Sequence, residues 1–247
     1  MARHRSRSGF TMLEMLVALA VASMLLAILL PTLSSGRVLS RRAICAGNQR
    51  FIGQAWEAYL QSNNARFPAL YVQPAWHYGG VRFSSVDGDA FLDYDRPLNH
   101  FLPDRHLDLP REDVFRCPAD RGITDEDGMI GTGQRSAYRA FGTSYRANAA
   151  LFNPQPDQNE SGQVQYGLGR DEITTAPSRL VVMGDPVWYE VSQSTGRSAN
   201  WHGPPHAGNL LFLDGSVRFV TIEPRPAVGP VVFDPVAPDL AFPMRKP

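Results

Sequence analysis

The chain has 247 residues with 24 basic and 24 acidic side chains, so its formal net charge at pH 7 is zero. This balance gives no support to a nucleic-acid partner, because nucleic-acid-binding domains concentrate basic residues on one face. The length suits one domain of ordinary size plus a helical stalk, and the 21 glycines and 20 prolines indicate a loop-rich domain that contains β-structure.

The chain opens with a basic leader and an apolar run. The run extends from Phe10 to Leu30 and contains one charged residue, Glu14. At about 1.5 Å per residue, a helix over this run would be roughly 31 Å long, which is the depth of a bilayer's hydrocarbon core. The leader, residues 1–9, carries three arginines. The positive-inside rule therefore predicts a cytoplasmic leader and a polar bulk on the other side of the membrane.

Two simpler interpretations of this run are a signal peptide and a plain membrane anchor. A signal peptide has an apolar region of about 7–15 residues before a small-residue cleavage site, whereas this run continues to Pro31. A plain anchor does not explain Glu14, because a carboxylate at the centre of a membrane helix costs about 2.5–3.5 kcal/mol and usually has a partner. Cleavage after Gly9 would supply that partner, the amine of a new N-terminus at Phe10.

The segment Gly9-Phe10-Thr11-x-x-Glu14 with its apolar run resembles the cleavage and methylation motif of type IV prepilins and type II secretion pseudopilins. The resemblance implies that a prepilin peptidase cuts after Gly9 and that the amine of Phe10 is then methylated. It implies a helix-kinking role for Pro31. It also implies that Glu14 pairs with the terminal amine of a neighbouring subunit in a filament core, where such a pair would favour one axial register.

The same resemblance implies a set of partners and a location. The partners are a prepilin peptidase/methyltransferase, other pilin-like subunits, an inner-membrane platform, a cytoplasmic assembly ATPase and membrane lipid. The location is the bacterial inner membrane, crossed once, with the N-terminus inside and the head in the periplasm. No cofactor is expected, apart from calcium as considered below.

The helix is predicted to continue beyond the membrane segment to about residue 62. After Pro31, apolar residues recur mostly at three- and four-residue spacing, which is typical of an amphipathic helix, and Asn63-Asn64 supplies a stop. We therefore expect a leader at 1–9, a transmembrane or filament-core helix at 10–30, an amphipathic continuation at 31–63, and a globular head at 64–247. The expected fold class is α+β, a long helix packed on a small antiparallel sheet.

The head has its clearest strand pattern near the C-terminus. Residues 178–185 read as a buried strand, and residues 209–213 and 216–220 read as a hairpin joined by Asp214-Gly215 in a type I′ turn. Weaker signals predict a strand at 81–83 and a short helix at 97–102. Polar residues at 153–169 predict a surface loop, and the proline-rich residues 223–247 predict an extended tail.

The chain has two cysteines, Cys45 and Cys117. In an oxidising compartment this number permits one disulfide, and a bridge across about seventy residues would remove considerable entropy from the unfolded chain. The alternative is two free buried thiols.

Four short blocks, one in the helix and three in the head, extend the resemblance to planctomycete-type pseudopilins, whose C-terminal module is named for a histidine, nine residues and Asp-Gly. The sequence departs from that name, because Pro204 stands at the expected histidine position, between His202 and His206. The blocks are Cys45-x-x-Asn48, Phe115-x-Cys117-Pro118-x-Asp120, Ser144-Tyr145-x-x-Asn148 and Asn209-x-x-Phe212-x-Asp214-Gly215.

The sequence offers little catalytic chemistry, and we expect no enzyme. It has no nucleophile elbow and no phosphate-binding loop. Asp125 and Asp127 lie in an acidic loop that could bind calcium but lacks the spaced ligand pattern of a calcium loop. The prediction is a structural pilin-like subunit. The alternative is a membrane-anchored periplasmic binding or metal-dependent enzymatic domain that uses His202, His206 and Asp214.

Overall fold

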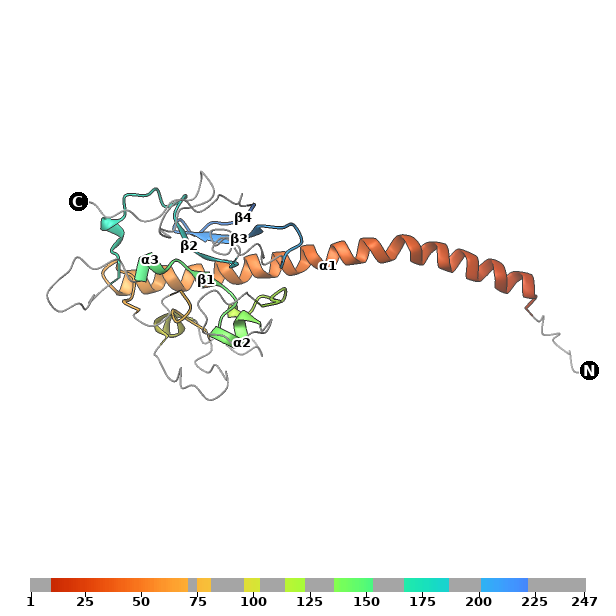
Figure 1. The fold of residues 1–247 in the computed structure, drawn as a ribbon, viewed down its shortest axis with the longest axis horizontal. Helices are drawn as coiled ribbons and strands as arrows, with labels where there is room; N and C mark the ends of the chain where they lie inside the picture. Colours follow the sequence, from red (N-terminus) through yellow and green to blue (C-terminus); the bar gives the residue numbers. More distant parts are fainter. Residues whose placement is uncertain are drawn as a thin grey trace, which may run out of the picture. The chain divides into compact units, whose positions relative to one another are not determined.

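The structure is a computed structural model, and it describes residues 10–70, 75–80, 96–102, 114–122, 136–152, 167–186 and 201–221. The chain divides into two compact units, Met1–Ser40 and Arg41–Pro247. Helix α1 (Met12–Ser62) begins in the first unit and ends in the second (Figure 1). All other described helices and strands belong to the second unit, which we call the head.

In the first unit, α1 is apolar and exposed. Its large side chains from Met12 to Leu33 are all more than half exposed, and Leu13 is exposed by 71%. The helix is long enough and apolar enough to cross a membrane, and none of its most apolar 18-residue window is buried. Pro31 lies inside the helix. The kink that was predicted there stays a prediction.

In the head, the C-terminal part of α1 buries one stripe of side chains. Cys45, Gln49, Ile52, Trp56 and Leu60 are all buried and follow one another at spacings of three or four residues. This is the periodicity of one helix face, so this part of α1 packs one face against the head. The helix ends as predicted at Asn63-Asn64, where Asn64 takes a positive φ of 52° and the amide of Ala65 donates to the Leu60 carbonyl.

A four-stranded antiparallel sheet lies against α1, in the order β1-β2-β3-β4. Figure 1 shows the sheet on one side of the C-terminal part of α1 and α2 on the other. The strands are β1 (Arg146–Ala147), β2 (Val181–Gly184), β3 (Ala207–Phe212) and β4 (Val217–Thr221). The α+β class, the strand predicted at 178–185 and the C-terminal hairpin are therefore confirmed.

The predicted type I′ turn of the hairpin is wrong. A type I′ turn needs positive φ at both central residues, but only Gly215 (φ 80°) has it here. The amide of Gly215 donates to the Phe212 carbonyl, and the Phe212 amide donates to the Ser216 carbonyl. These bonds define a three-residue loop with glycine at the left-handed position, and Asp-Gly suits this loop equally well.

Short helices fill the rest of the head. They are the 3₁₀ turn η1 (Pro97–Phe101), α2 (Ala137–Phe141), α3 (Ala149–Phe152) and the 3₁₀ turn η3 (Arg170–Glu172). The first confirms the short helix predicted at 97–102. The predicted strand at 81–83, most of the loop at 153–169 and the tail at 223–247 lie outside the described residues.

Aromatic rings make the centre of the core. Trp56 of α1 stacks on Phe152 of α3 at a centroid distance of 5.3 Å and meets Phe67 edge-on at 5.5 Å. Tyr78 stacks on Phe152 from a third segment at 6.3 Å. Each such pair adds about 0.5–1.5 kcal/mol beyond the burial of its area, so these rings fix the loop-rich segments to α1.

One buried arginine organises the loops around this core. The guanidinium of Arg96, 4% exposed, donates to the carbonyls of Trp76, Gly79 and Phe141 at 3.2, 2.5 and 2.7 Å. Burial lowers the pKa of Arg96 to about 10. The planar guanidinium therefore ties together two loops and the end of α2 that no regular element connects.

Candidate functional site

The first candidate site is the N-terminal end of α1. Gly9 lies outside the described residues, and Phe10 is 78% exposed. The carboxylate of Glu14 accepts hydrogen bonds from the amide and the hydroxyl of Thr11, each at 2.8 Å. The amide of Glu14 donates back to the Thr11 hydroxyl at 3.2 Å. Thr11 and Glu14 thus form a capping box, in which each side chain bonds the other's backbone amide.

This capping box was missed at the sequence level, although its signal is in the motif. Thr-x-x-Glu before an apolar run is the sequence signature of a helix N-terminus. The predicted partner of Glu14 is the amine of a processed N-terminus, and a bond to Thr11 was not predicted. In the structure the carboxylate already has two donors from Thr11, so a partner amine would replace or join existing bonds.

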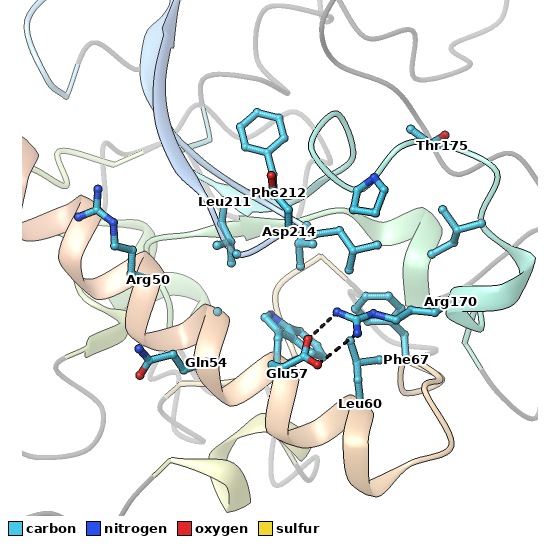
Figure 2. Close-up of a pocket in the computed structure, with 17 residues that line it drawn as sticks. Arg50, Gln54, Glu57, Leu60, Phe67, Arg170, Thr175, Leu211, Phe212 and Asp214 are labelled. Atoms are coloured by element: carbon cyan, nitrogen blue, oxygen red, sulfur yellow. Dashed lines mark hydrogen bonds and ion pairs between the residues drawn. The ribbon is translucent and has the colours of Figure 1, made fainter.

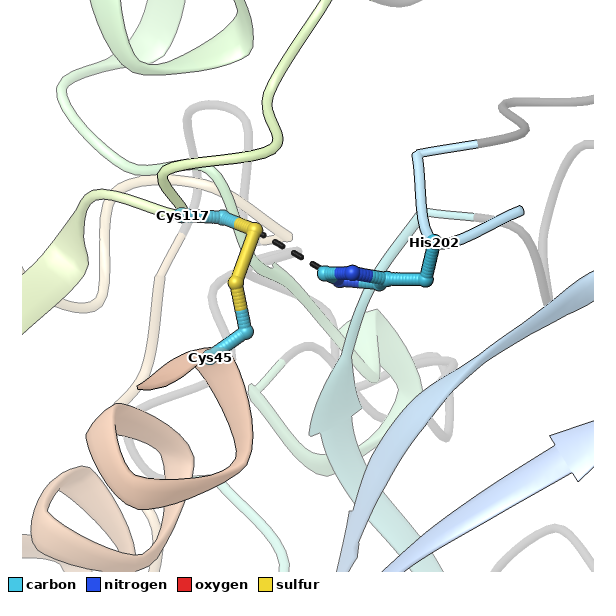
Figure 3. Close-up of side chains that lie close together, drawn as sticks. All are labelled: Cys45, Cys117 and His202. Atoms are coloured by element: carbon cyan, nitrogen blue, oxygen red, sulfur yellow. Dashed lines mark hydrogen bonds between the residues drawn. A yellow bond between two sulfur atoms is a disulfide. The ribbon is translucent and has the colours of Figure 1, made fainter. Parts of the chain in front are cut away.

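The second candidate site is a buried cluster around the disulfide of the head. Cys45 of α1 and Cys117 are bonded, with their Cα atoms 5.2 Å apart. This is the pairing that the sequence permitted. Figure 3 shows the ring of His202 pointing at the bridge, with its Nε2 3.5 Å from the sulfur of Cys117. All three residues are buried.

A buried carboxylate shares this histidine. Oδ2 of Asp185 lies 3.1 Å from Nε2 of His202, and both side chains are at most 2% exposed. The same oxygen accepts the amide of Asn209 at 2.7 Å, and Oδ1 accepts Nε2 of Gln49 at 3.2 Å. Nε2 of Gln49 also donates to the Asn209 carbonyl. Helix α1, the end of β2 and strand β3 therefore meet at one polar centre inside the head.

Asp120 lies at a second polar centre. Its two oxygens accept five hydrogen bonds of 2.7–3.0 Å, three of them from backbone amides and two from hydroxyls. The amide donors include Ala137 and Tyr138, the first residues of α2, so Asp120 caps that helix from a distant segment. The hydroxyl of Ser144 donates to Asp120 and accepts the amide of Cys117.

Tyr145, Asn148 and Asn48 also serve the fold. The hydroxyl of Tyr145 accepts a hydrogen bond from Nδ2 of Asn48, which also donates to the Arg116 carbonyl. Nδ2 of Asn148 donates to the Val181 carbonyl, and its Oδ1 accepts the amide of Ala150 at the start of α3. Burial and the charge of Asp185 raise the pKa of Tyr145 well above its ordinary value. These residues satisfy backbone groups and present no reactive atom to solvent.

The alternative metal set of His202, His206 and Asp214 is not assembled. Asp214 is exposed in the hairpin loop, where its Oδ1 accepts the amide and hydroxyl of Ser216. His206 and Asp214 flank opposite ends of β3, a six-residue strand about 20 Å long. Within the described ranges, the one group of three metal-binding side chains that lie close together is Cys45, Cys117 and His202. The calcium candidates Asp125 and Asp127 lie outside the described residues.

The head also has a groove of about 700 Å³ between α1, the segment around Arg170 and the β3–β4 loop. Figure 2 shows Glu57 of α1 and Arg170 pointing at each other across it, at 2.5 Å. The hydrogen bond from Arg170 lowers the pKa of Glu57. Both side chains are more than a third exposed, so solvent screening limits this ion pair to at most about 1 kcal/mol. The groove floor is apolar, with Leu60 and Phe67.

The buried partners of these centres could not be found from local patterns. Asp185 is the last residue of a predicted strand, and His202 was considered only as a metal ligand beside His206. Their contact with each other and with Gln49 joins positions 49, 185 and 202, which share no spacing. A cysteine within reach of a histidine needs the fold before it can be recognised.

Comparison with known proteins gives one match. Residues 4–30 match the family described as the prokaryotic N-terminal methylation motif. No curated protein and no solved structure matches the chain. The match covers the leader and the apolar part of α1, whereas the resemblance of the four short blocks stays a prediction.

Proposed function

We propose that the chain is a structural subunit of a filament, because its N-terminal methylation motif is pilin-like. The chain is cut after Gly9 by a prepilin peptidase, methylated at Phe10, and assembled through its N-terminal helix with other pilin-like subunits. The filament serves a type II secretion system or a type IV pilus-like machine. An inner-membrane platform and a cytoplasmic ATPase are the further partners in this proposal.

The observation that carries the proposal is the combination of this motif with an exposed apolar helix. The first unit of the chain leaves large apolar side chains in contact with solvent along about twenty residues of α1. Contiguous apolar surface of this size needs lipid or protein to cover it. A membrane covers it before assembly, and neighbouring copies of the same helix cover it in a filament. The leader remains in the cytoplasm and the head lies in the periplasm.

The head supports a structural role. Asp120, Tyr145, Asn148 and Asp214 are used to hold loops and helix ends, and Asn209 donates to the Arg42 carbonyl of α1. These polar residues therefore stabilise the packing of the head on the long helix.

Processing is tested by replacing Gly9 with a bulky residue. Gly9→Leu should leave the leader attached, which mass spectrometry of the purified chain would show as an uncut and unmethylated N-terminus. Gly36→Leu is the matched control, because a Cβ at Gly36 meets nothing within 4 Å. Normal cleavage in Gly9→Leu would contradict the proposal.

Assembly is tested at Glu14. Glu14→Gln keeps an acceptor for Thr11 and removes the charge, whereas Thr11→Ala removes the side-chain part of the capping box and keeps the charge. If the carboxylate pairs with a neighbour's amine, Glu14→Gln is processed normally but fails to enter filaments, and Thr11→Ala assembles. Filament entry of Glu14→Gln at the wild-type level would refute this role.

A further inference from the structure

We propose that the head binds one zinc ion when its disulfide is reduced, through the thiolates of Cys45 and Cys117, Nε2 of His202 and Oδ2 of Asp185. The proposal concerns the buried cluster around the bridge and does not depend on filament assembly. Cys45 and Cys117 then either form the disulfide or bind zinc together with His202 and Asp185.

The distances from Nε2 of His202 to its two neighbouring donor atoms are close to those around a tetrahedral ion. With zinc–sulfur bonds of about 2.3 Å and zinc–nitrogen or zinc–oxygen bonds of about 2.0–2.1 Å, ligand atoms lie roughly 3.6 Å apart for sulfur and nitrogen and roughly 3.3 Å apart for nitrogen and oxygen. Nε2 of His202 lies 3.5 Å from the sulfur of Cys117 and 3.1 Å from Oδ2 of Asp185. One ligand atom from each of Cys45, Cys117 and His202 falls within 4.8 Å of the others. Asp185 is not part of this group, so its carboxylate has to approach the sulfurs, and the sulfurs have to part.

The two sulfurs must separate. They are bonded to each other in the bridge and would be roughly 3.8 Å apart around zinc. The change is small enough for side-chain rotation, because the Cα atoms stay near their present separation of 5.2 Å. Figure 3 shows the bridge running from α1 to the segment of Cys117, with His202 approaching from its side. The ion would sit between the sulfurs and the imidazole.

The surroundings suit a closed structural site. All four residues are at most 2% exposed, so no position is left for solvent or substrate. The carboxylate of Asp185 is held by the Asn209 amide on Oδ2 and by Gln49 on Oδ1, as metal-binding carboxylates commonly are. The two thiolates are soft ligands and the imidazole is a borderline one, so the set favours zinc over calcium or magnesium, and a carboxylate is a normal fourth ligand of zinc.

Zinc replaces the disulfide in two steps, reduction of the bridge and then metal binding. A dithiol reductant transfers two electrons and two protons to the bridge, which gives two thiols and an oxidised reductant. Zinc then displaces both thiol protons. The imidazole hydrogen has to lie on Nδ1, a buried atom with no hydrogen-bond partner among the described residues, so that Nε2 can bind the ion. Either the disulfide or the zinc ion holds α1 to the segment of Cys117.

The test uses the full chain in detergent, freed of metal, and cobalt(II) as a spectroscopic substitute for zinc. After reduction with a phosphine, one equivalent of cobalt should give a thiolate-to-metal charge-transfer band and the intense visible bands of a tetrahedral site. The oxidised chain should give neither. Absence of these bands from the reduced chain would overturn the proposal.

Variants separate this site from adventitious binding. His202→Asn should weaken cobalt and zinc binding at least about tenfold. His206→Asn is the matched control, because asparagine tolerates the positive φ of 56° at this position, and it should bind as the wild type does. Equal affinity in His202→Asn and His206→Asn would refute a role for His202.

Reduction alone could unfold the head, and the cysteines of an unfolded chain also bind zinc. Thermal unfolding followed by circular dichroism resolves this case. One equivalent of zinc should raise the melting temperature of the reduced chain, or restore a cooperative transition if reduction abolished it, and should leave the oxidised chain unchanged. A reduced chain that zinc neither stabilises nor refolds would overturn the proposal.

Discussion

Removal of the bridge between Cys45 and Cys117 should cost a large part of the stability of the head. The two residues are 72 positions apart, so the bridge closes a long loop in the unfolded chain. The entropy of closing such a loop is about 15 cal/mol/K, which corresponds to about 4 kcal/mol at room temperature. In a domain of this size that free energy lowers the melting temperature by roughly 8–16 °C.

The measurement is denaturant unfolding of the full chain in detergent, with a metal chelator present. The double variant Cys45→Ser/Cys117→Ser should lose about 4 kcal/mol relative to the oxidised wild type. The wild type treated with a reductant should lose a similar amount, and this second route contains no substitution. If both routes change the free energy of unfolding by less than about 1 kcal/mol, the loop-closure reasoning is wrong.

Three further predictions concern the head. Asp120→Ala should cost about 3–5 kcal/mol in denaturant unfolding because five donors lose their acceptor, and Asp120→Asn, which keeps one acceptor oxygen, should cost less. Arg96→Lys should lower stability by about 2–4 kcal/mol, since an ammonium cannot reproduce the fork that reaches three carbonyls, and a loss below 0.5 kcal/mol would contradict this. Unfolding at alkaline pH should report on the buried Tyr145, because burial raises its pKa in the folded state. Its contribution to the free energy of unfolding is therefore complete below about pH 10, the ordinary pKa of tyrosine, and is lost as pH rises above that value. Tyr78 acts in the same direction and Arg96 in the opposite one, and Tyr145→Phe should flatten the fall of stability with pH.

The parts of the fold that the sequence predicted are those with a local physical signal. Helix α1 follows from an unbroken apolar run and then a stripe at helical spacing, and it ends where Asn64 can take a positive φ. The hairpin follows from two apolar runs around Asp-Gly. The type of its loop did not follow, because Asp214-Gly215 fits more than one hairpin loop and strand registration selects between them.

The parts that were not predicted depend on contacts between distant residues. Helices α2 and α3 are only five and four residues long, too short to form on their own. The distant Asp120 caps α2, and Asn148, which caps α3 locally, donates to the Val181 carbonyl of β2. The contact of His202 with Asp185 likewise appears only when β2 and the segment before β3 lie together. In each case a side chain in one segment completes the backbone or the charge of another.

The capping box at the start of α1 has a consequence for the energetics of joining and leaving a filament. The carboxylate of Glu14 accepts two hydrogen bonds from Thr11 before any neighbouring subunit binds. A neighbour's amine would therefore compete with Thr11, and the net gain per subunit would be a small difference between two sets of bonds. The apolar side chains of the helix would then hold the subunits together, and the exchange at Glu14 would select the register in which neighbouring helices stack.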